Sequence, residues 1–340
     1  MKKFLNNVIA SKYFSFFVTV GLFLVLYAVG IMTYKGFMGP QVFFNLFSDN
    51  AALIIVTVGI TFTLLIAGID LSVGAVLALC CMILAYLLEN TGVPVGAAVL
   101  LVLALGTAFG ALQGYIITKF DLQPFIITLA GMFFCRGMTA VISQNTITIS
   151  NPFYVGLASE RIGVFGLGFV SIGAVIAILT LVIAAVVLGY TKFGRTVFAI
   201  GGSESSASLM GLPVFRTKVT VYTISGFCAA LGGVAYSLIM LTGYNLHGLG
   251  MEMDAIASSV IGGTLLTGGV GFIPGTLFGV LIQGVILTFI TFQGTLSAWW
   301  TKIVVGALLC VFIVMQALIT ERKSKLSSKR SMESAGSAKS

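Results

Sequence analysis

Long stretches without a charged residue are what most limits the folds open to this chain. Asp254 and Lys302 are separated by 47 uncharged residues, and gaps of 20, 18 and 29 residues follow one another between Asp49 and Lys119. A bilayer requires roughly 20 apolar residues per helix. Only 8% of the residues are charged, against about 25% in soluble proteins, and the mean hydropathy is +1.12. These values exclude a soluble enzyme, a disordered chain and a nucleic-acid binder, and they predict an all-α polytopic membrane protein.

The gaps between charges predict about ten transmembrane helices within a permease-sized domain at residues 13–319. The first, at 13–33, follows three lysines but is too long for a signal peptide and has no cleavage site, so it is interpreted as a retained helix. The 47 uncharged residues would span about 70 Å as a helix, which is enough for two crossings with a break. The last span is expected near 298–319.

Positive charges divide unequally between the two sides that ten spans define. With the N-terminus inside, 14 of the 18 Lys and Arg residues are cytoplasmic, while Lys35 and Arg161 lie outside and Arg136 and Lys302 fall within spans. This asymmetry predicts that both termini are cytoplasmic. Residues 1–12 form the cytoplasmic N-terminus, and 320–340 form a basic tail that is predicted to be disordered. A solvated tail is favoured over one that binds anionic lipid.

The residues needed for most enzyme chemistry are missing from the sequence. His247 is the only histidine, the five cysteines form no C-x-x-C pair, and no phosphate-binding G-x-x-x-x-G-K-[ST] motif occurs. The cysteines are interpreted as small buried apolar residues. No metal, catalytic triad or nucleotide is therefore assigned to this chain, and an intramembrane enzyme is not supported.

A glycine-flanked carboxylate interrupts the apolar pattern at residues 66–74. Asp70 and Ser72 lie between Gly68 and Gly74, and both side chains can accept from N–H groups at the start of the next helix. A carboxylate at membrane depth is costly unless its hydrogen bonds are satisfied. The favoured interpretation is a capped turn, and the alternative is direct contact with a substrate or a gate.

A second, glycine-rich interruption at residues 261–271 aligns with the first. Gly263 matches Gly68, Thr267 matches Ser72 and Gly269 matches Gly74, which suggests a degenerate internal repeat. Residues 106–110 also resemble residues 275–279, although the two segments fall on spans predicted to run in opposite directions. Broken helices in corresponding positions indicate a substrate path in transporters, whereas close helix packing is the favoured alternative for so many small residues. Thr264 and Thr267 each supply a hydroxyl group that could form brief hydrogen bonds with a substrate.

A third departure is the cytoplasmic loop at residues 190–218. It contains Gly201 and Gly202, then Ser203 as a predicted N-cap, Glu204 at the positive end of a short helix, and Gly211 as its stop. Such a helix is not needed to span a bilayer. It is interpreted as a surface that engages a partner, and the alternative is an inert amphipathic turn.

These motifs together resemble the permeases of bacterial ribose/galactose-type ABC sugar importers. The resemblance covers about residues 45–315 and rests on four ordered motifs, at 68–74, 124–137, 193–202 and 257–264. Within that family the chain most resembles permeases of galactofuranose importers, through residues 127–136, 265–271 and 294–302. One departure is Ser203, where family members commonly have Asn; both residues cap helices.

The resemblance implies a transport subunit in the bacterial inner membrane that imports a monosaccharide, galactofuranose or a related sugar. It implies an ABC ATPase that binds ATP and magnesium, a second permease in a heterodimer (or, alternatively, a homodimer) and a periplasmic or lipid-anchored binding protein. The chain itself binds no cofactor and no nucleic acid. The main rival is an ion-coupled secondary sugar carrier, which the scarcity of intramembrane carboxylates argues against.

Two sets of residues are predicted to carry function. The substrate path includes Asp70, Ser72, Arg136, Gly263, Thr264 and Thr267, and the surface coupled to the ATPase includes Gly201, Gly202, Ser203, Glu204 and Gly211.

Overall fold

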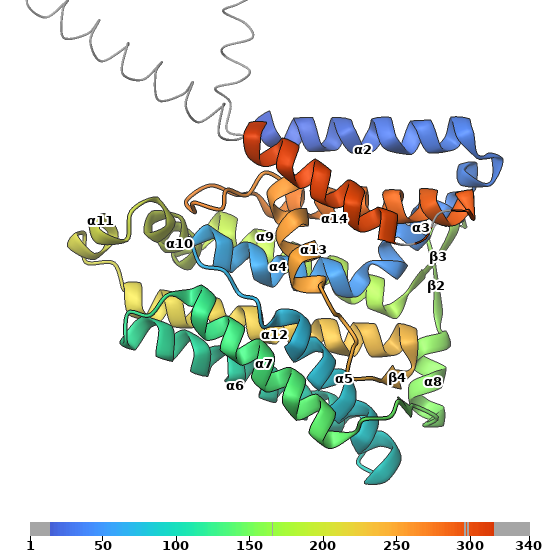
Figure 1. The fold of residues 1–340 in the computed structure, drawn as a ribbon, viewed down its shortest axis with the longest axis horizontal. Coiled ribbons are helices and arrows are strands. Elements are labelled where there is room, and N and C mark those ends of the chain that lie inside the picture. Colours follow the sequence, from blue (N-terminus) through green and yellow to red (C-terminus); the bar gives the residue numbers. More distant parts are fainter. Residues whose placement is uncertain (1–13, 165, 296, 298, 316–340) are drawn as a thin grey trace, which may run out of the picture.

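The computed structural model describes residues 14–164, 166–295, 297 and 299–315. Most of them are helical, as the sequence predicts (Figure 1). The helices are α2 (Phe14–Thr33), the 3-10 helix η1 (Lys35–Met38), α3 (Pro40–Asp49), α4 (Ala51–Leu65), α5 (Val73–Asn90), α6 (Val95–Lys119), α7 (Pro124–Ile142), α8 (Pro152–Ser159), α9 (Ile172–Tyr190), α10 (Lys192–Gly202), α11 (Glu204–Leu209), α12 (Val214–Met240), α13 (Met251–Ile261), α14 (Ile273–Gln293) and a last helix at Trp299–Met315. The predicted N-terminal segment 1–12 and the tail 320–340 lie outside the described residues.

Seven of the described helices are long and apolar enough to cross a bilayer, or eight when α3 and α4, which are bent by 54° at Asn50, count as one broken span. The predicted total of ten is not confirmed. Part of the difference arises from the last helix, of which 17 residues are described, and part between Asp254 and Lys302, where the sequence predicts two crossings. There the chain forms the end of α13, an irregular segment and α14. With 11 residues, α13 is about 16 Å long, half of what a bilayer requires.

The sequence predicts a span that fills much of residues 163–190, and the helix found there leaves the first part of this range free. Residues 161–171 instead form a hairpin of β2 (Arg161–Val164) and β3 (Gly168–Ser171), in which Arg161 faces Ser171. Helix α9 then begins at Ile172, with Ser171 as its N-cap. A second short pairing joins β1 (Ile147–Thr148) to β4 (Thr242–Gly243). Together with α8, these strands gather at the end of the molecule opposite α10 and α11 (Figure 1).

The centre of the molecule is built on α4 and α12. Helix α4 has no polar face, and 14 of its 15 residues are buried, as expected for a helix that is apolar all round and covered on every side. Helix α12 packs against α6 through glycine. A Cβ on Gly226 would come within 2.2 Å of the Gly106 carbonyl, and a Cβ on Gly110 within 2.3 Å of the Tyr222 carbonyl. Small residues therefore allow these backbones to touch.

The two ends of the described chain lie close together in Figure 1. The start of α2 and the end of the last helix are at the same end of the molecule as α10 and α11. Helix α6 runs toward this end and α14 away from it. The resemblance between residues 106–110 and 275–279 therefore joins segments of opposite direction, as the sequence predicts.

Candidate functional site

The first interruption, between α4 and α5, is a tight turn stabilised by its own backbone. The N–H of Gly68 donates to the Thr63 carbonyl at 2.9 Å, and Ala67 has a φ of +58°. A left-handed conformation costs a non-glycine residue about 1–2 kcal/mol, so the surroundings must hold Ala67 in place. Gly68 is packed against α12, because a Cβ there would lie 2.4 Å from the Tyr222 hydroxyl.

Asp70 links this turn to the helices around it. The residue is 1% exposed, and its carboxylate accepts from the backbone N–H and the hydroxyl of Ser72, at 2.9 and 2.6 Å, and from the Ser225 hydroxyl of α12, at 2.6 Å. The Ser72 hydroxyl also lies 3.1 Å from Oε1 of Gln113 on α6. Asp70 therefore caps the turn, the favoured interpretation. Ser72 caps nothing with its side chain, contrary to expectation, because its hydroxyl is directed to Asp70 and Gln113.

The second interruption, predicted at residues 261–271, lies at 262–272 between α13 and α14, and its turns are made by glycine. Gly263, Gly268 and Gly269 have φ values of +98°, +82° and +72°. Within the segment, the Leu265 N–H donates to the Val270 carbonyl at 2.9 Å. Glycine is needed here because other residues rarely adopt this conformation.

Close packing explains several of the other small residues nearby. A Cβ on Gly275 would lie 2.0 Å from the Gly262 carbonyl, and one on Gly279 would lie 2.0 Å from the Ser258 carbonyl. The start of α14 thus packs directly on the end of α13. For these three glycines the packing interpretation is the one observed.

The two interruptions touch each other. The Gly269 N–H donates to the Leu65 carbonyl at the end of α4, at 2.9 Å. A Cβ on Gly268 would come within 2.8 Å of the Ala67 nitrogen. The second interruption therefore also holds Ala67 in its strained conformation. The aligned positions differ in detail, because Gly74 is helical whereas Gly269 is left-handed.

The loop at residues 190–218 reaches the same point. A Cβ on Gly201, at the end of α10, would lie 1.7 Å from the Leu65 carbonyl oxygen and 2.4 Å from the Gly269 nitrogen. A Cβ on Gly202 would meet nothing within 4 Å. Three segments that the sequence marks separately therefore meet, backbone against backbone, at the Leu65 carbonyl. We call this point the Leu65 junction.

The loop at 190–218 is more ordered than predicted. Its first part forms the helix α10, which the sequence analysis missed although Phe193, Val197 and Ile200 recur on one helical face. The predicted short helix is present as α11. The Ser203 hydroxyl accepts from the Ser206 N–H at 3.2 Å, as an N-cap does.

Helix α11 is tied to the start of α12. Glu204 forms an ion pair with Lys218, with Nζ to Oε1 at 2.8 Å, and Gly211 ends the helix with a φ of +73°. At the tip of the loop, Leu209 and Met210 are exposed. The loop is thus folded into two short helices and has an apolar tip.

The remaining predicted path residues lie apart from one another. Thr264 is fully buried, Thr267 is exposed, and Gly263 lies at the end of α13. Arg136 lies on α7, where Nη1 donates to the carbonyls of Asn245 and His247 at 2.9 and 2.7 Å. The structure therefore does not bring the six residues into one site. Among the cysteines, Cys310 is exposed while the other four are buried.

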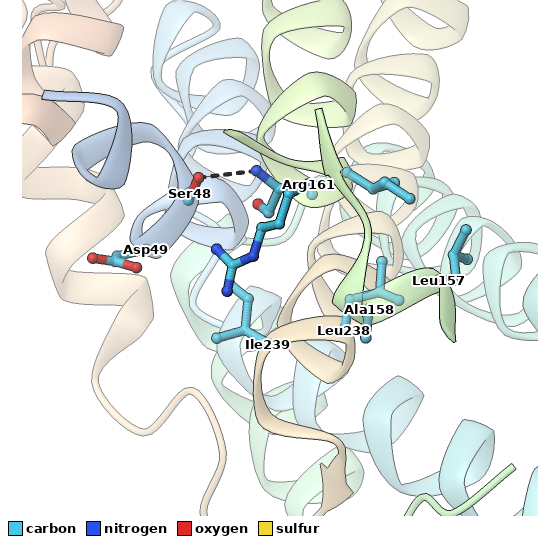
Figure 2. A pocket seen from close by; sticks show the side chains of 10 residues that line it. Ser48, Asp49, Leu157, Ala158, Arg161, Leu238 and Ile239 are labelled. Atoms are coloured by element: carbon cyan, nitrogen blue, oxygen red, sulfur yellow. Dashed lines mark hydrogen bonds between the residues drawn. The ribbon is translucent and has the colours of Figure 1, made fainter. Parts of the chain in front are cut away.

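A hollow at the opposite end of the molecule is separate from the Leu65 junction. It lies between α3, α8, the β2–β3 hairpin and the end of α12, and Figure 2 shows the Arg161 side chain reaching between Asp49 and Ile239. The Ser48 hydroxyl accepts from the Ser171 N–H at 3.1 Å on its wall. None of the residues predicted to carry function lines it.

Comparisons with known proteins cover most of the chain. Residues 42–313 match the family described as "Branched-chain amino acid transport system / permease component". The inner membrane ABC transporter permease YjfF of Escherichia coli K12 is 45% identical over 89% of this chain and 92% of its own length. The fructose import permease FruG of Bifidobacterium longum is 38% identical over 88% and 89%, and the ribose import permease RbsC of Bacillus subtilis 36% over 89% and 91%. No solved structure matches the chain.

Proposed function

Because the chain belongs to the family of permease components of branched-chain amino acid transport systems, we propose that it is the membrane-spanning subunit of an ATP-driven monosaccharide importer. The names of its relatives favour a sugar over an amino acid, since FruG and RbsC are named for fructose and ribose import. The sequence motifs favour galactofuranose or a related sugar. The chain performs transport and no chemical reaction.

The Leu65 junction is the observation that carries the mechanism. ATP binding closes the partner ATPase subunits, and their movement displaces α11 and α10. The end of α10 contacts both helix interruptions without an intervening side chain. Its displacement therefore acts directly on α4 and on the segment before α14, and the path for the sugar opens alternately to either side.

The proposed assembly contains two permeases, two ATPase subunits or domains that bind ATP and magnesium, and an external sugar-binding protein. A heterodimer with a sibling permease is proposed over a homodimer. The end of the molecule that holds α10, α11 and both described chain ends (Figure 1) faces the cytoplasm. The excess of Lys and Arg assigned to this side supports that orientation in the bacterial inner membrane.

The apolar tip of α11 is proposed as the contact with the ATPase. Leu209 is 90% exposed, and exposing an apolar side chain to water is unfavourable unless a partner covers it. Leu209→Asp should abolish co-purification of the ATPase with the permease while membrane insertion is unchanged. Leu167→Asp is the matched control, since Leu167 is 63% exposed on the hairpin at the opposite end. Equal co-purification with both variants would contradict this docking site.

Uptake into proteoliposomes tests the proposed function itself. The purified complex should accumulate radiolabelled D-galactose, D-ribose or D-fructose only with its binding protein outside and ATP with magnesium at the ATPase. Uptake driven by a proton or sodium gradient without ATP would replace the proposal with an ion-coupled secondary carrier. Stimulation of ATP hydrolysis by the sugar-loaded binding protein gives a second, independent measurement.

A further inference from the structure

An irregular segment between α12 and α13 runs back into the molecule from its outer end. After β4, residues 244–250 pass alongside α5 to the start of α13 (Figure 1). Leu246 and Leu249 on this segment are exposed, so the described chain leaves part of it uncovered. Irregular backbone at membrane depth is tolerated only where protein buries it or where it lines a wet cavity. The segment therefore borders either a partner or an aqueous path.

Arg136 fixes the position of this segment. Its Nη1 donates to two carbonyls of the segment, those of Asn245 and His247. Guanidinium has five N–H donors, and among the described residues its hydrogen bonds involve Nη1 alone. Donors of Arg136 therefore remain for another group next to residues 244–250.

Two buried acceptors in the same place lack a partner. Within the described part of the chain, Oδ1 of Asn245 and Oε2 of Glu252 accept no hydrogen bond. Glu252 is 8% exposed, and its Oε2 lies against the start of α5, where a Cβ on Gly74 would approach it to 2.4 Å. Nearby backbone N–H groups of α13 interact favourably with the carboxylate, but none reaches Oε2 within hydrogen-bond distance. Buried acceptors without a donor are costly, so a ligand or water must satisfy them.

Arg136 and Glu252 carry opposite charges but do not form an ion pair with each other. The two side chains interact electrostatically, but they form no ion pair within 4 Å. A site with one charge of each sign has no net attraction for a cation or an anion. It offers strong donors and strong acceptors to an uncharged molecule.

Aromatic rings complete the surroundings. The His247 ring lies 4.9 Å from that of Tyr236 and 5.7 Å from that of Tyr244, centroid to centroid, and its Nε2 is 3.1 Å from the Thr242 hydroxyl. Small-molecule sites combine aromatic walls with a few placed polar groups. We infer that residues 244–250, with Arg136 and Glu252, form a contact site for a neutral monosaccharide during its passage. This inference rests on the proposed import of a sugar and adds the residues that touch it.

The inference predicts a loss of sugar movement without a loss of ATP hydrolysis. In the reconstituted complex, Glu252→Gln should reduce uptake of the transported sugar among D-galactose, D-ribose and D-fructose about tenfold, because it weakens a charge-assisted hydrogen bond. ATP hydrolysis stimulated by the binding protein should stay within about twofold of the original. Asp254→Asn is the matched control. Asp254 lies two residues away on α13 and pairs with Lys302 instead, and its replacement should leave uptake unchanged.

Labelling gives a readout that does not depend on transport rates. Asn245→Cys in a Cys310→Ser background leaves only buried native cysteines. A small hydrophilic thiol reagent should label the introduced thiol, and the transported sugar should slow the labelling whereas mannitol should not. An introduced thiol that does not react, labelling that the sugar does not slow, or uptake that Glu252→Gln leaves unchanged would each overturn the inference while the proposed function stands. Failure of the unmodified complex to take up any of the three sugars would overturn both.

Discussion

The two helix interruptions that meet at the Leu65 junction are closed in different ways. Between α4 and α5, a carboxylate accepts three hydrogen bonds, and Ala67 is the one left-handed residue. Between α13 and α14, three glycines are left-handed and the backbone bonds to itself. Side-chain hydrogen bonds connect the first interruption to the helices around it. The second interruption has glycines in place of side chains, so its backbone packs directly against the neighbouring segments.

This difference predicts different roles for the two interruptions. Asp70 bonds to α12 and, through Ser72, approaches Gln113 of α6, so moving the first interruption would break bonds to two helices. The second interruption is joined to the first by the Gly269 to Leu65 hydrogen bond, and its glycines permit other backbone conformations. We expect the first to be the fixed element and the second to move during transport.

Removing the Asp70 carboxylate should have the largest effect, because it breaks the fixed interruption. Asp70→Leu leaves one N–H and two hydroxyls without their acceptor, and the free energy of unfolding should fall by about 3 kcal/mol or more. Asp70→Asn retains one acceptor oxygen and should lose less than half as much. Denaturant titration of the purified protein in detergent measures both. Equal losses in the two variants would point to a requirement for the charge itself.

Replacing Gly201 tests the junction between the two interruptions. In Gly201→Ala, the new methyl group would overlap the Leu65 carbonyl, and overpacking of this kind costs about 1–3 kcal/mol. Sugar uptake and stimulated ATP hydrolysis should both fall about tenfold or more, with the amount in the membrane unchanged.

Gly202→Ala is the control for this experiment, because nothing lies within 4 Å of the added carbon. It should transport normally. A variant at Gly202 as inactive as the one at Gly201 would show that helix flexibility, and not the contact with Leu65, is what transport requires.

Alanine substitutions at two left-handed glycines should have a smaller effect. They separate the cost of backbone strain from the loss of the contact that the second interruption makes with α10. Gly269 and Gly294 have similar φ values, +72° and +68°, but only at Gly269 would an added Cβ meet a close neighbour, the Gly202 nitrogen at 2.9 Å. Both Ala variants should lose about 1 kcal/mol from the left-handed conformation. Only Gly269→Ala should also slow uptake, by several-fold. Identical uptake in the two would remove the role of the contact.

The mildest test asks whether the second interruption changes its exposure. In a Cys310→Ser background, Thr267→Cys should react with a hydrophilic thiol reagent, and Thr264→Cys, at a fully buried position, should not. If this segment moves, nucleotide bound to the ATPase should change the labelling of at least one of them. Constant labelling in every nucleotide state would identify the segment as static packing.

Most of the fold follows from the spacing of charges in the sequence. The gaps bounded by Asp49, Asp70, Glu89 and Lys119 correspond to α4, α5 and α6, and Glu89 and Lys119 lie at the ends of their helices, because charges are rare in the middle of spans. The hairpin at 161–171 was missed because short strands carry little periodic signal. The two crossings predicted after Asp254 are not confirmed, because length alone does not distinguish two crossings from a half-length helix followed by a break.

The sequence predicted the segments that form the Leu65 junction, but not that they contact one another. Asp70, Gly201 and Gly269 each stand in a segment that departs from the apolar pattern. These three segments meet at the Leu65 carbonyl through backbone contacts between residues more than 60 positions apart, for which a single sequence carries no signal. Glu252 and Asn245 were overlooked, although a carboxylate beside an apolar stretch is itself a reason to expect function.

The contact at the Leu65 carbonyl also determines how stiff the connection is. A side chain between two helices can change rotamer, so that one helix shifts by about an ångström without moving the other. At Gly201 no side chain is present, and peptide planes of three segments bear directly on one another. A small displacement of the loop therefore moves the end of α4 by nearly the same amount. Because the backbones are already in contact, the position accepts no residue larger than glycine.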